Sequence, residues 1–208
     1  MTAGELLNHL NLKTASIGLP QLVNAVSMVY LNAAYKAFVT GIGGVYDEIT
    51  INLVATEVNV ILPSYVLKVK AARDADGDFV KVYNRGDTEK LETLPANGTL
   101  RYLLIGVKPG LIRVVDTPVA NTTITLDVDR APIASLVAAD EASDVALRWQ
   151  IDMLDYAVAH NAMLSPDPKI RAQAGAFEAR FNLNVTTARR ERIREKSKPT
   201  RVVAYGGL

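Results

Sequence analysis

Few residues in this chain are of the types that carry out catalysis. The two histidines are His9, in an expected N-terminal helix, and His160, one turn after Tyr156 in a later helix. Both positions are typical of structural or surface histidines. The sequence has no Gly-x-Ser-x-Gly nucleophile elbow, no His-Glu-x-x-His metal motif and no Gly-Lys-Ser/Thr phosphate loop. We therefore expect no catalytic residue, no metal site and no cofactor.

Three short segments imitate ligand-binding motifs. The aspartates of RDADGDF (73–79) alternate as in an EF-hand loop, but Gly77 falls at the fourth position instead of the sixth, so we interpret the segment as a hairpin turn. GIGGVY (41–46) begins like a dinucleotide fingerprint but follows a helix, which indicates a helix stop. RGD (85–87) matches a cell-adhesion tripeptide and also makes an ordinary turn.

Positive charge is concentrated in one stretch, TARRERIREKSKPTR (187–201). Its seven basic residues and two acids give it a charge of +5, and because the whole chain is +1, the remainder carries −4. The basic residues are Arg189, Arg190, Arg192, Arg194, Lys196, Lys198 and Arg201. Such an asymmetry predicts a partner for this segment without identifying it.

Three interpretations of the basic stretch stay open. As a solvated helix face it is weak, because Glu191–Glu195 and Arg190–Arg194 are like charges one turn apart and each pair costs about 0.2–0.5 kcal/mol. Nucleic acid would need only phosphate contacts, but aromatic residues are not interleaved with the cations and the rest of the chain is negative. A protein groove fits better, because VVAYGGL (202–208) adds apolar and aromatic anchors.

The composition is that of a globular protein. A hydrophobic fraction of 49% over 208 residues is enough for a core, which excludes disorder of the whole chain. Cysteine is absent, which excludes disulfides, thiol catalysis and cysteine-based zinc sites. The opening MTAGELLNHLNLK lacks the basic start and apolar run of a signal peptide, and no segment is apolar enough to span a bilayer. We expect a protein made in the cytoplasm, with no membrane partner, and used there or inside an assembly.

Helical spacing dominates the first part of the chain and alternation the middle. A helix is expected within 19–44, with one buried stripe formed by Leu22, Val26, Val29, Ala33 and Ala37. From about residue 47 to 130 short runs alternate with period two, as in EITINL and EVNVIL, and turn-forming pairs such as Asp76-Gly77 separate most of them. Short strands with short turns predict an antiparallel meander.

Helical spacing returns after Pro132. A helix is expected over 140–164, and the residues along one of its faces are Val145, Trp149, Met153, Tyr156, His160 and Met163. A second helix is expected to start with Ser165 as its N-cap and Pro166 in its first turn. Its narrow stripe contains Ile170, Ala174, Phe177 and Phe181.

These patterns together predict an α+β protein. The N-terminal helix (1–46) and a C-terminal helical hairpin (131–188) form a small bundle, and an antiparallel β-meander domain (47–130) is inserted between them. An extended basic C-terminal arm (189–208) follows the hairpin.

This order of parts resembles the head-to-tail adaptor proteins of tailed bacteriophages, in particular the gatekeeper-type adaptors of short-tailed phages. Three stretches carry the likeness to the opening helix, the last strands and the helix pair of that family. They are LVNAVSMVYLNAAYKAFV (22–39), LIRVVDTPVANTTITLDVDRAPIASL (111–136) and LRWQIDMLDYAVAHNAMLSPDPKIRAQAGAFEARF (147–181).

The resemblance implies a structural virion protein at the head–tail junction. Such adaptors form a homo-oligomeric ring, usually a dodecamer, on the portal protein. The ring extends the channel through which packaged DNA passes without sequence-specific binding, and it is a platform for the tail nozzle or tube protein. The C-terminal helix and tail grip the portal, which assigns that contact here to Arg189, Arg190, Arg192, Arg194, Lys196, Lys198, Arg201, Tyr205 and Leu208. The turns at Asp76, Asp78 and Arg85 are expected to contact the tail component or a neighbouring subunit.

Other functions remain as alternatives to the adaptor. One is a different connector or tail structural protein, such as a tail terminator. A nucleic-acid-binding module that uses the basic tail would bind DNA alone with a steep salt dependence. An enzyme would need a pocket with perturbed titratable groups, and the sequence offers few of them.

Overall fold

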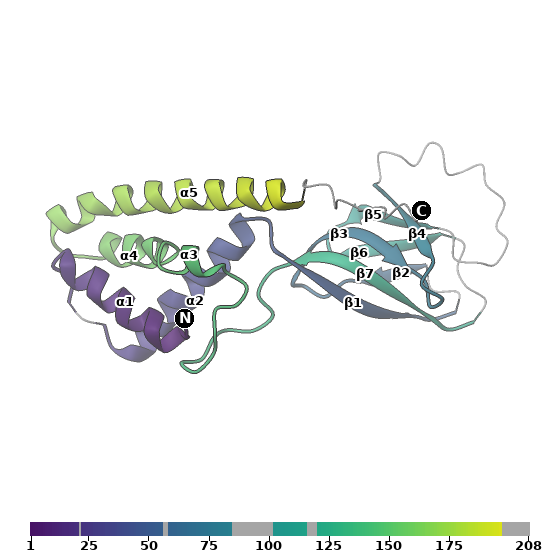
Figure 1. The fold of residues 1–208 in the computed structure, drawn as a ribbon, viewed down its shortest axis with the longest axis horizontal. Helices are drawn as coiled ribbons and strands as arrows, with labels where there is room; N and C mark the ends of the chain where they lie inside the picture. Colours follow the sequence, from purple (N-terminus) through teal and green to yellow (C-terminus); the bar gives the residue numbers. More distant parts are fainter. Residues whose placement is uncertain (21, 56–57, 85–101, 116–119, 197–208) are drawn as a thin grey trace, which may run out of the picture. The chain divides into compact units, whose positions relative to one another are not determined.

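The computed structural model describes residues 1–20, 22–55, 58–84, 102–115 and 120–196 (Figure 1). The chain divides into two compact units. The helical unit consists of Met1–Ile42 and the described residues from Ala134 onward, and the β unit is Gly43–Ile133. The predicted α+β class is confirmed. The predicted domain boundaries at 46/47, 130/131 and 188/189 stay a prediction.

Helix α1 (Ala3–Ser16) opens the helical unit with a capping box. Thr2 Oγ1 accepts a hydrogen bond from the Glu5 backbone nitrogen at 3.2 Å, and Glu5 Oε2 accepts one from the Thr2 nitrogen at 2.8 Å. These two bonds satisfy backbone donors that the helix itself leaves without partners, and such caps are worth about 1 kcal/mol. Leu6, Leu7 and Leu10 are buried along one side of the helix.

Helix α2 (Asn24–Gly41) lies within the predicted span, but its predicted buried stripe is wrong. The buried apolar side chains are Leu31, Ala34, Tyr35, Phe38 and Val39. Val26 and Val29 of the predicted stripe are exposed instead, and Leu22, Ala33 and Ala37 are half-buried. The reason is that α2 is apolar on two opposite sides, so its period alone does not identify the side that faces the core.

The helix predicted over 140–164 begins later and is interrupted. It consists of α3 (Leu147–Gln150) and α4 (Leu154–Met163). The Gln150 amide donates to the carbonyls of Ala142 and Val145 at 3.0 and 2.9 Å. These bonds fix the segment before α3 in a non-helical conformation. Along the predicted face, Val145 and Met153 are buried, whereas His160 and Met163 on α4 are exposed.

Helix α5 (Pro168–Lys196) follows α4 after a short link. Its predicted stripe is confirmed, because Ala174 and Phe181 are buried and Ile170 and Phe177 are half-buried. The start lies two residues later than predicted. Asp167 Oδ1 accepts from the Lys169 nitrogen at 2.8 Å, which is the capping role expected of Ser165.

Figure 1 shows α4 between α5 and the pair α1 and α2, and α4 contacts all three. Phe38 of α2 packs against Phe181 of α5 and Trp149 of α3, with ring centroids 6.1 and 6.5 Å apart. The helical unit is therefore one bundle held around α4.

Within the described part of the β unit, seven strands form one sheet in the spatial order β1-β7-β3-β4-β5-β6-β2. The strands are β1 (Val45–Leu53), β2 (Asn59–Ile61), β3 (Val66–Arg73), β4 (Phe79–Asn84), β5 (Tyr102–Lys108), β6 (Leu111–Val115) and β7 (Thr122–Arg130). Short reversals join β3 to β4 and β5 to β6, where Gly77 and Gly110 take the left-handed conformation.

The predicted all-antiparallel meander is wrong, because the sheet is mixed. Strands β4 and β5 are parallel, with Lys81 opposite Tyr102. Strands β1 and β7, at the two ends of the unit in sequence, pair antiparallel from Val45↔Arg130 to Leu53↔Thr122. Parallel neighbours need a long connection, and the link between β4 and β5 (85–101) is long enough to serve as one.

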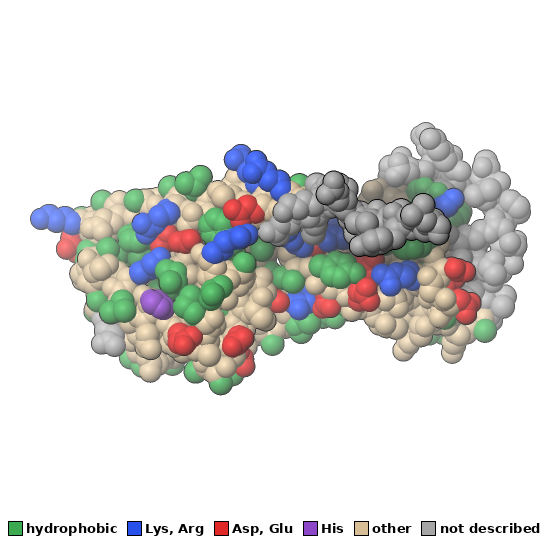
Figure 2. All heavy atoms as spheres, in the orientation of Figure 1, with side chains coloured by type: hydrophobic (Ala, Val, Ile, Leu, Met, Phe, Trp, Pro, Cys, Tyr) green, Lys and Arg blue, Asp and Glu red, His purple; other side chains and the backbone are tan. Residues whose placement is uncertain are grey.

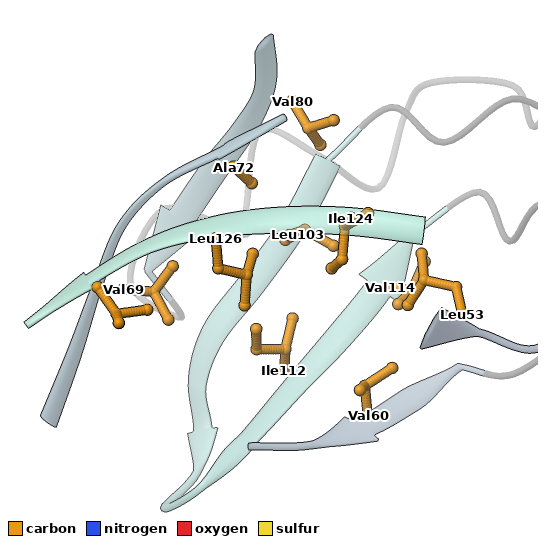
Figure 3. Close-up of a cluster of buried hydrophobic side chains, with 11 residues drawn as sticks. Leu53, Val60, Val69, Ala72, Val80, Leu103, Ile112, Val114, Ile124 and Leu126 are labelled. Atoms are coloured by element: carbon orange, nitrogen blue, oxygen red, sulfur yellow. The ribbon is translucent and has the colours of Figure 1, made fainter. Parts of the chain in front are cut away.

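The sheet folds over one apolar core (Figure 3). In the close-up, Ile124 and Leu126 of β7 point toward Leu103, Ile112 and Val114 on β5 and β6. Leu53 and Val60 extend this cluster to the two edge strands β1 and β2. Each fully buried side chain of this size contributes about 1.5–3 kcal/mol relative to exposure.

Candidate interaction surface at the end of the last helix

Basic side chains gather on the last turns of α5, and Figure 2 shows Lys and Arg side chains over this part of the helix. Arg189, Arg190 and Arg194 are exposed, whereas Arg192 is half-buried. We call these four residues the basic end of α5. Lys196 is the last residue of the helix. The predicted contacts Lys198, Arg201, Tyr205 and Leu208 and the Lys196 side chain lie outside the described residues.

Contacts within the helical unit hold the basic end in place. Ala188 is buried, and Glu191 Oε2 lies 2.7 Å from Arg148 Nη2. Arg192 Nη1 donates to the Ile42 carbonyl at 3.2 Å. Ile42 is the C-cap of α2, where backbone carbonyls carry the negative end of the helix dipole, so a guanidinium is favourable there.

These contacts explain why the helix includes a segment that would gain little from folding alone. The like-charge pairs identified in the sequence weaken an isolated helix by a few tenths of a kcal/mol each. Packing of Ala188, the ion pair of Glu191 and the hydrogen bond of Arg192 supply stabilisation that an isolated peptide lacks.

The sequence contains a signal that distinguishes Arg192 from the other cations of the basic stretch, which were predicted as one group. Arg192 lies four residues after the buried Ala188, which itself lies seven residues after the buried Phe181. It therefore continues the inward stripe of α5. Arg190 and Arg194, also one turn apart, lie on the exposed side and present two adjacent guanidiniums to a partner.

A second set of ionic contacts fixes the middle of α5. Asp155 of α4 is fully buried, and it pairs with Arg180 of α5 and with Lys13 of α1. The hydrogen bond to Asp155 raises the pKa of the Arg180 guanidinium above its ordinary value. The basic end is therefore the continuation of a helix that is tied to both α1 and α4 upstream.

The predicted contacts Asp76 and Asp78 lie in the exposed β3–β4 turn. Asp74 Oδ1 accepts from the backbone nitrogens of Asp76 and Asp78 at 3.1 and 2.9 Å, which confirms the hairpin turn. Arg85 lies outside the described residues. The contact of this turn with a tail component or neighbouring subunit stays a prediction.

Both histidines lie at positions typical of surface or structural residues. His160 is exposed, with its ring centroid 4.2 Å from that of Tyr156, and His9 is half-exposed on α1. Within the part of the chain that the structure describes, no cluster of three His, Asp or Glu side chains is suited to hold a metal ion. None of the described helices is long and apolar enough to cross a membrane.

A comparison with protein-family models places this arrangement in a known family. The model described as "SU10 adaptor protein" matches residues 1–203, which cover both units and reach beyond the basic end of α5. No curated protein matches the sequence. The family match agrees with the resemblance to phage head-to-tail adaptors that the sequence suggested, and that resemblance is confirmed. The chain belongs to the SU10 adaptor protein family.

Proposed function

We propose that this protein is a structural adaptor at the phage head–tail junction and that it binds the portal protein through the basic end of α5 and the residues that follow it. The observation that carries the proposal is the exposure of Arg189, Arg190 and Arg194 on the last turns of α5. Glu191 and Arg192 hold these turns to the rest of the helical unit. Exposed guanidiniums on an ordered helix suit an acidic protein surface, because the backbone that carries them is already folded before contact.

The rest of the adaptor function follows from this attachment. Copies of the chain form a ring on the portal, a dodecamer as in the resembling adaptors, and the ring extends the DNA channel without sequence-specific binding. The β3–β4 turn at Asp76 and Asp78, together with Arg85, contacts the tail nozzle or tube or a neighbouring subunit. The protein has no enzymatic role in this proposal and resides in the virion.

Charge distribution supports an ionic attachment. The stretch from Arg189 to Arg201 carries +5 and the remainder of the chain −4. Repeated around a ring, such segments attract an acidic surface strongly, and the attraction weakens as salt shortens the screening length to about 8 Å at physiological ionic strength.

The first test is the mass of complexes formed with the portal protein encoded by the same genome. Full-length chain is compared with a chain that ends at Ala188. We expect about a dozen copies of the full-length chain on the portal assembly and none of the shortened one. Equal binding of both chains would show that the basic end is not the attachment site, and absence of binding by both would contradict the adaptor role on this portal.

A charge-reversal series separates the arginines from the rest of the tail. Arg189, Arg190 and Arg194 are changed together to Glu. The control changes three exposed lysines of the β unit to Glu, namely Lys68, Lys81 and Lys108, which alters the net charge by the same amount. We expect loss of portal binding in the first variant and not in the second. Equal loss in both would indicate a general charge effect.

Nucleic acid is the second candidate for the same cations, because exposed arginines also suit phosphate. Titration of full-length chain with duplex DNA over a salt series distinguishes the two partners. Tight, steeply salt-dependent DNA binding that competes with portal binding would favour the nucleic-acid module. We expect DNA binding that is too weak to compete with portal binding.

A further inference from the structure

Helix α2 has a second apolar face that the described residues of the helical unit cover only in part, since Ala33 and Ala37 on it are half-buried and its other members are exposed. One row on this face, Ala25, Val29, Ala33 and Ala37, is spaced by four residues, with Val26 beside it. Val26 is 44% exposed and Val29 69% exposed, whereas Leu31 and Ala34 on the core side are fully buried. We call these five residues the outer face of α2. A helix that is apolar on opposite sides is expected to be covered on both.

Charge is almost absent from α2. Lys36 is the single charged residue between Asn24 and Gly41. A helix that faces solvent normally carries several charges on its exposed side, because nothing else keeps that side soluble. The outer face of α2 therefore has the composition of an interface that is depleted of charge.

Helix α5 presents a different uncharged face in its first half. Ala172, Gly175, Ala176, Ala179 and Leu183 are all exposed and lie opposite the buried stripe of this helix. We call them the outer face of α5. An added Cβ at Gly175 would meet nothing within 4 Å, so this side of the helix is open. Small residues at spacings of three and four allow another helix to approach closely.

We propose that the outer face of α2 in one copy of this chain packs on the outer face of α5 in the next copy. Two unlike faces on one unit make a head-to-tail contact, and such a contact closes into a ring when the rotation between copies allows it. The inference rests on the proposed function for the ring itself, and it assigns the surfaces that join neighbouring subunits.

The area of the contact argues for an assembly of many copies instead of a stable dimer. The 18 residues of α2 span about 27 Å, and a stripe about 10 Å wide along them is far smaller than the roughly 800 Å² per partner of a stable complex. One such contact is weak in dilute solution. Neighbours held on a common platform meet at a much higher effective concentration, which favours the contact there.

The charges beside the two faces are complementary. Lys36 is exposed on α2, and Glu178, exposed on α5, is the only acid between Pro168 and Ala188. A second copy therefore brings an ammonium and a carboxylate to the rim of the same contact, which sets register more than affinity.

The test uses the absence of cysteine from the chain. Full-length Val29→Cys and Ala179→Cys variants are prepared separately, mixed, and treated with a short bismaleimide cross-linker. The reaction is carried out once with the variants in solution at high protein concentration and once with the variants bound to the portal protein. The control mixture pairs Val29→Cys with Gln173→Cys, an exposed position on another side of α5. Circular dichroism melting checks that each variant folds.

We expect a cross-linked dimer in the Val29→Cys and Ala179→Cys mixture, and a strong loss of it in the control and in either variant alone. Lys36→Glu should reduce the dimer, and Glu178→Lys on the partner should restore it. Cross-linking of Val29→Cys with itself would show that two α2 faces meet, which overturns the head-to-tail contact. If the mixture of the two variants forms no cross-linked dimer either in solution or on the portal, the proposed interface is wrong.

Portal binding by the unsubstituted chain is measured in parallel. If cross-linking succeeds and portal binding fails, the subunit contact stands and the proposed portal partner is wrong. If portal binding succeeds and the mixture does not cross-link, the proposed function stands and the faces assigned here are wrong.

Discussion

Arg180 binds the fully buried carboxylate of Asp155 through two nitrogens. Its Nη2 lies 2.9 Å from Oδ1, and its Nε donates to Oδ2. Lys13 Nζ donates to the same Oδ1 at 2.8 Å, so one side chain of α4 joins α5 and α1. A carboxylate removed from water is tolerated only when such partners satisfy it.

The first prediction concerns this buried carboxylate. Replacing both cations, as Lys13→Met with Arg180→Met, leaves Asp155 buried without a counter-charge and should cost about 3–5 kcal/mol of unfolding free energy. Either single change should cost much less than half of that, because the other cation still pairs with Asp155. Urea unfolding followed by Trp149 fluorescence measures these values, since Trp149 is the only tryptophan and lies in the helical unit.

Glu178→Gln is the control for this series, because Glu178 is exposed on the same helix. It should change stability by less than about 0.5 kcal/mol. Additive effects of the two methionine substitutions would contradict the shared role of Asp155.

The second prediction concerns the crossing of α2 and α5. A Cβ added at Gly41 would lie 2.7 Å from Val185 Cγ1, so Gly41→Ala should destabilise the helical unit by about 1–3 kcal/mol. The second substitution Val185→Ala should recover part of this loss by making room. The same unfolding experiment measures both variants.

Gly175→Ala is the matched comparison, because it is also a helical glycine and no atom lies within 4 Å of its added Cβ. It should stabilise the protein by about 0.5–1 kcal/mol through helix propensity. Stabilisation by Gly41→Ala as well would show that the two helices do not approach this closely in solution.

Local sequence patterns predicted some elements well. They failed where the same pattern allows either of two faces of a helix to be buried. The stripe of α5 was correct because Ile170, Phe177 and Phe181, the large apolar side chains between residues 168 and 182, all lie on one side of the helix. The stripe of α2 was wrong because Val26 and Leu31 lie on opposite sides that are both apolar. Hydrophobic period identifies a face but cannot say which of two faces meets the core.

Local patterns could not predict the order of strands in the sheet, for a related reason. Alternation at Ile49, Ile51 and Leu53 identified a strand with one inward face, and the structure has it. Nothing in that pattern names the partner strand, and β1 pairs with β7, which lies some 70 residues later in the chain. Pairing partners are set by the whole core, so local patterns could not give the sheet topology. Charge located the basic stretch, but its residues 189–196 belong to helix α5 and the predicted extended arm is wrong there.

The third prediction distinguishes two arginines of the basic end. Arg192→Leu removes the bond to the Ile42 carbonyl, whereas Arg194→Leu removes only an exposed guanidinium. Amide hydrogen exchange should become faster over the last two turns of α5 in the first variant and stay unchanged in the second. Both variants should weaken portal binding, and equal exchange rates in the two would contradict the anchoring role of Arg192.

The last prediction concerns Gly44, at the point where the chain enters the β unit. Its φ is +83°, and an added Cβ would lie 2.7 Å from the Arg130 carbonyl oxygen and 2.9 Å from Leu67 Cδ1. Gly106 has a similar φ of +79° but nothing within 4 Å. Gly106→Ala should therefore cost only the backbone strain, about 1–2 kcal/mol, whereas Gly44→Ala should cost clearly more.

Hydrogen exchange of the β1, β3 and β7 amides measures both glycine variants within the β unit, and Trp149 fluorescence follows the helical unit in the same samples. If the units fold on their own, Gly44→Ala lowers protection in these strands and leaves the Trp149 transition in place. Equal costs for the two glycines would contradict the close approach at Gly44. A shift of the Trp149 transition by the same amount would show that the two units unfold as one, because strain confined to the β unit can reach Trp149 only through a shared cooperative transition.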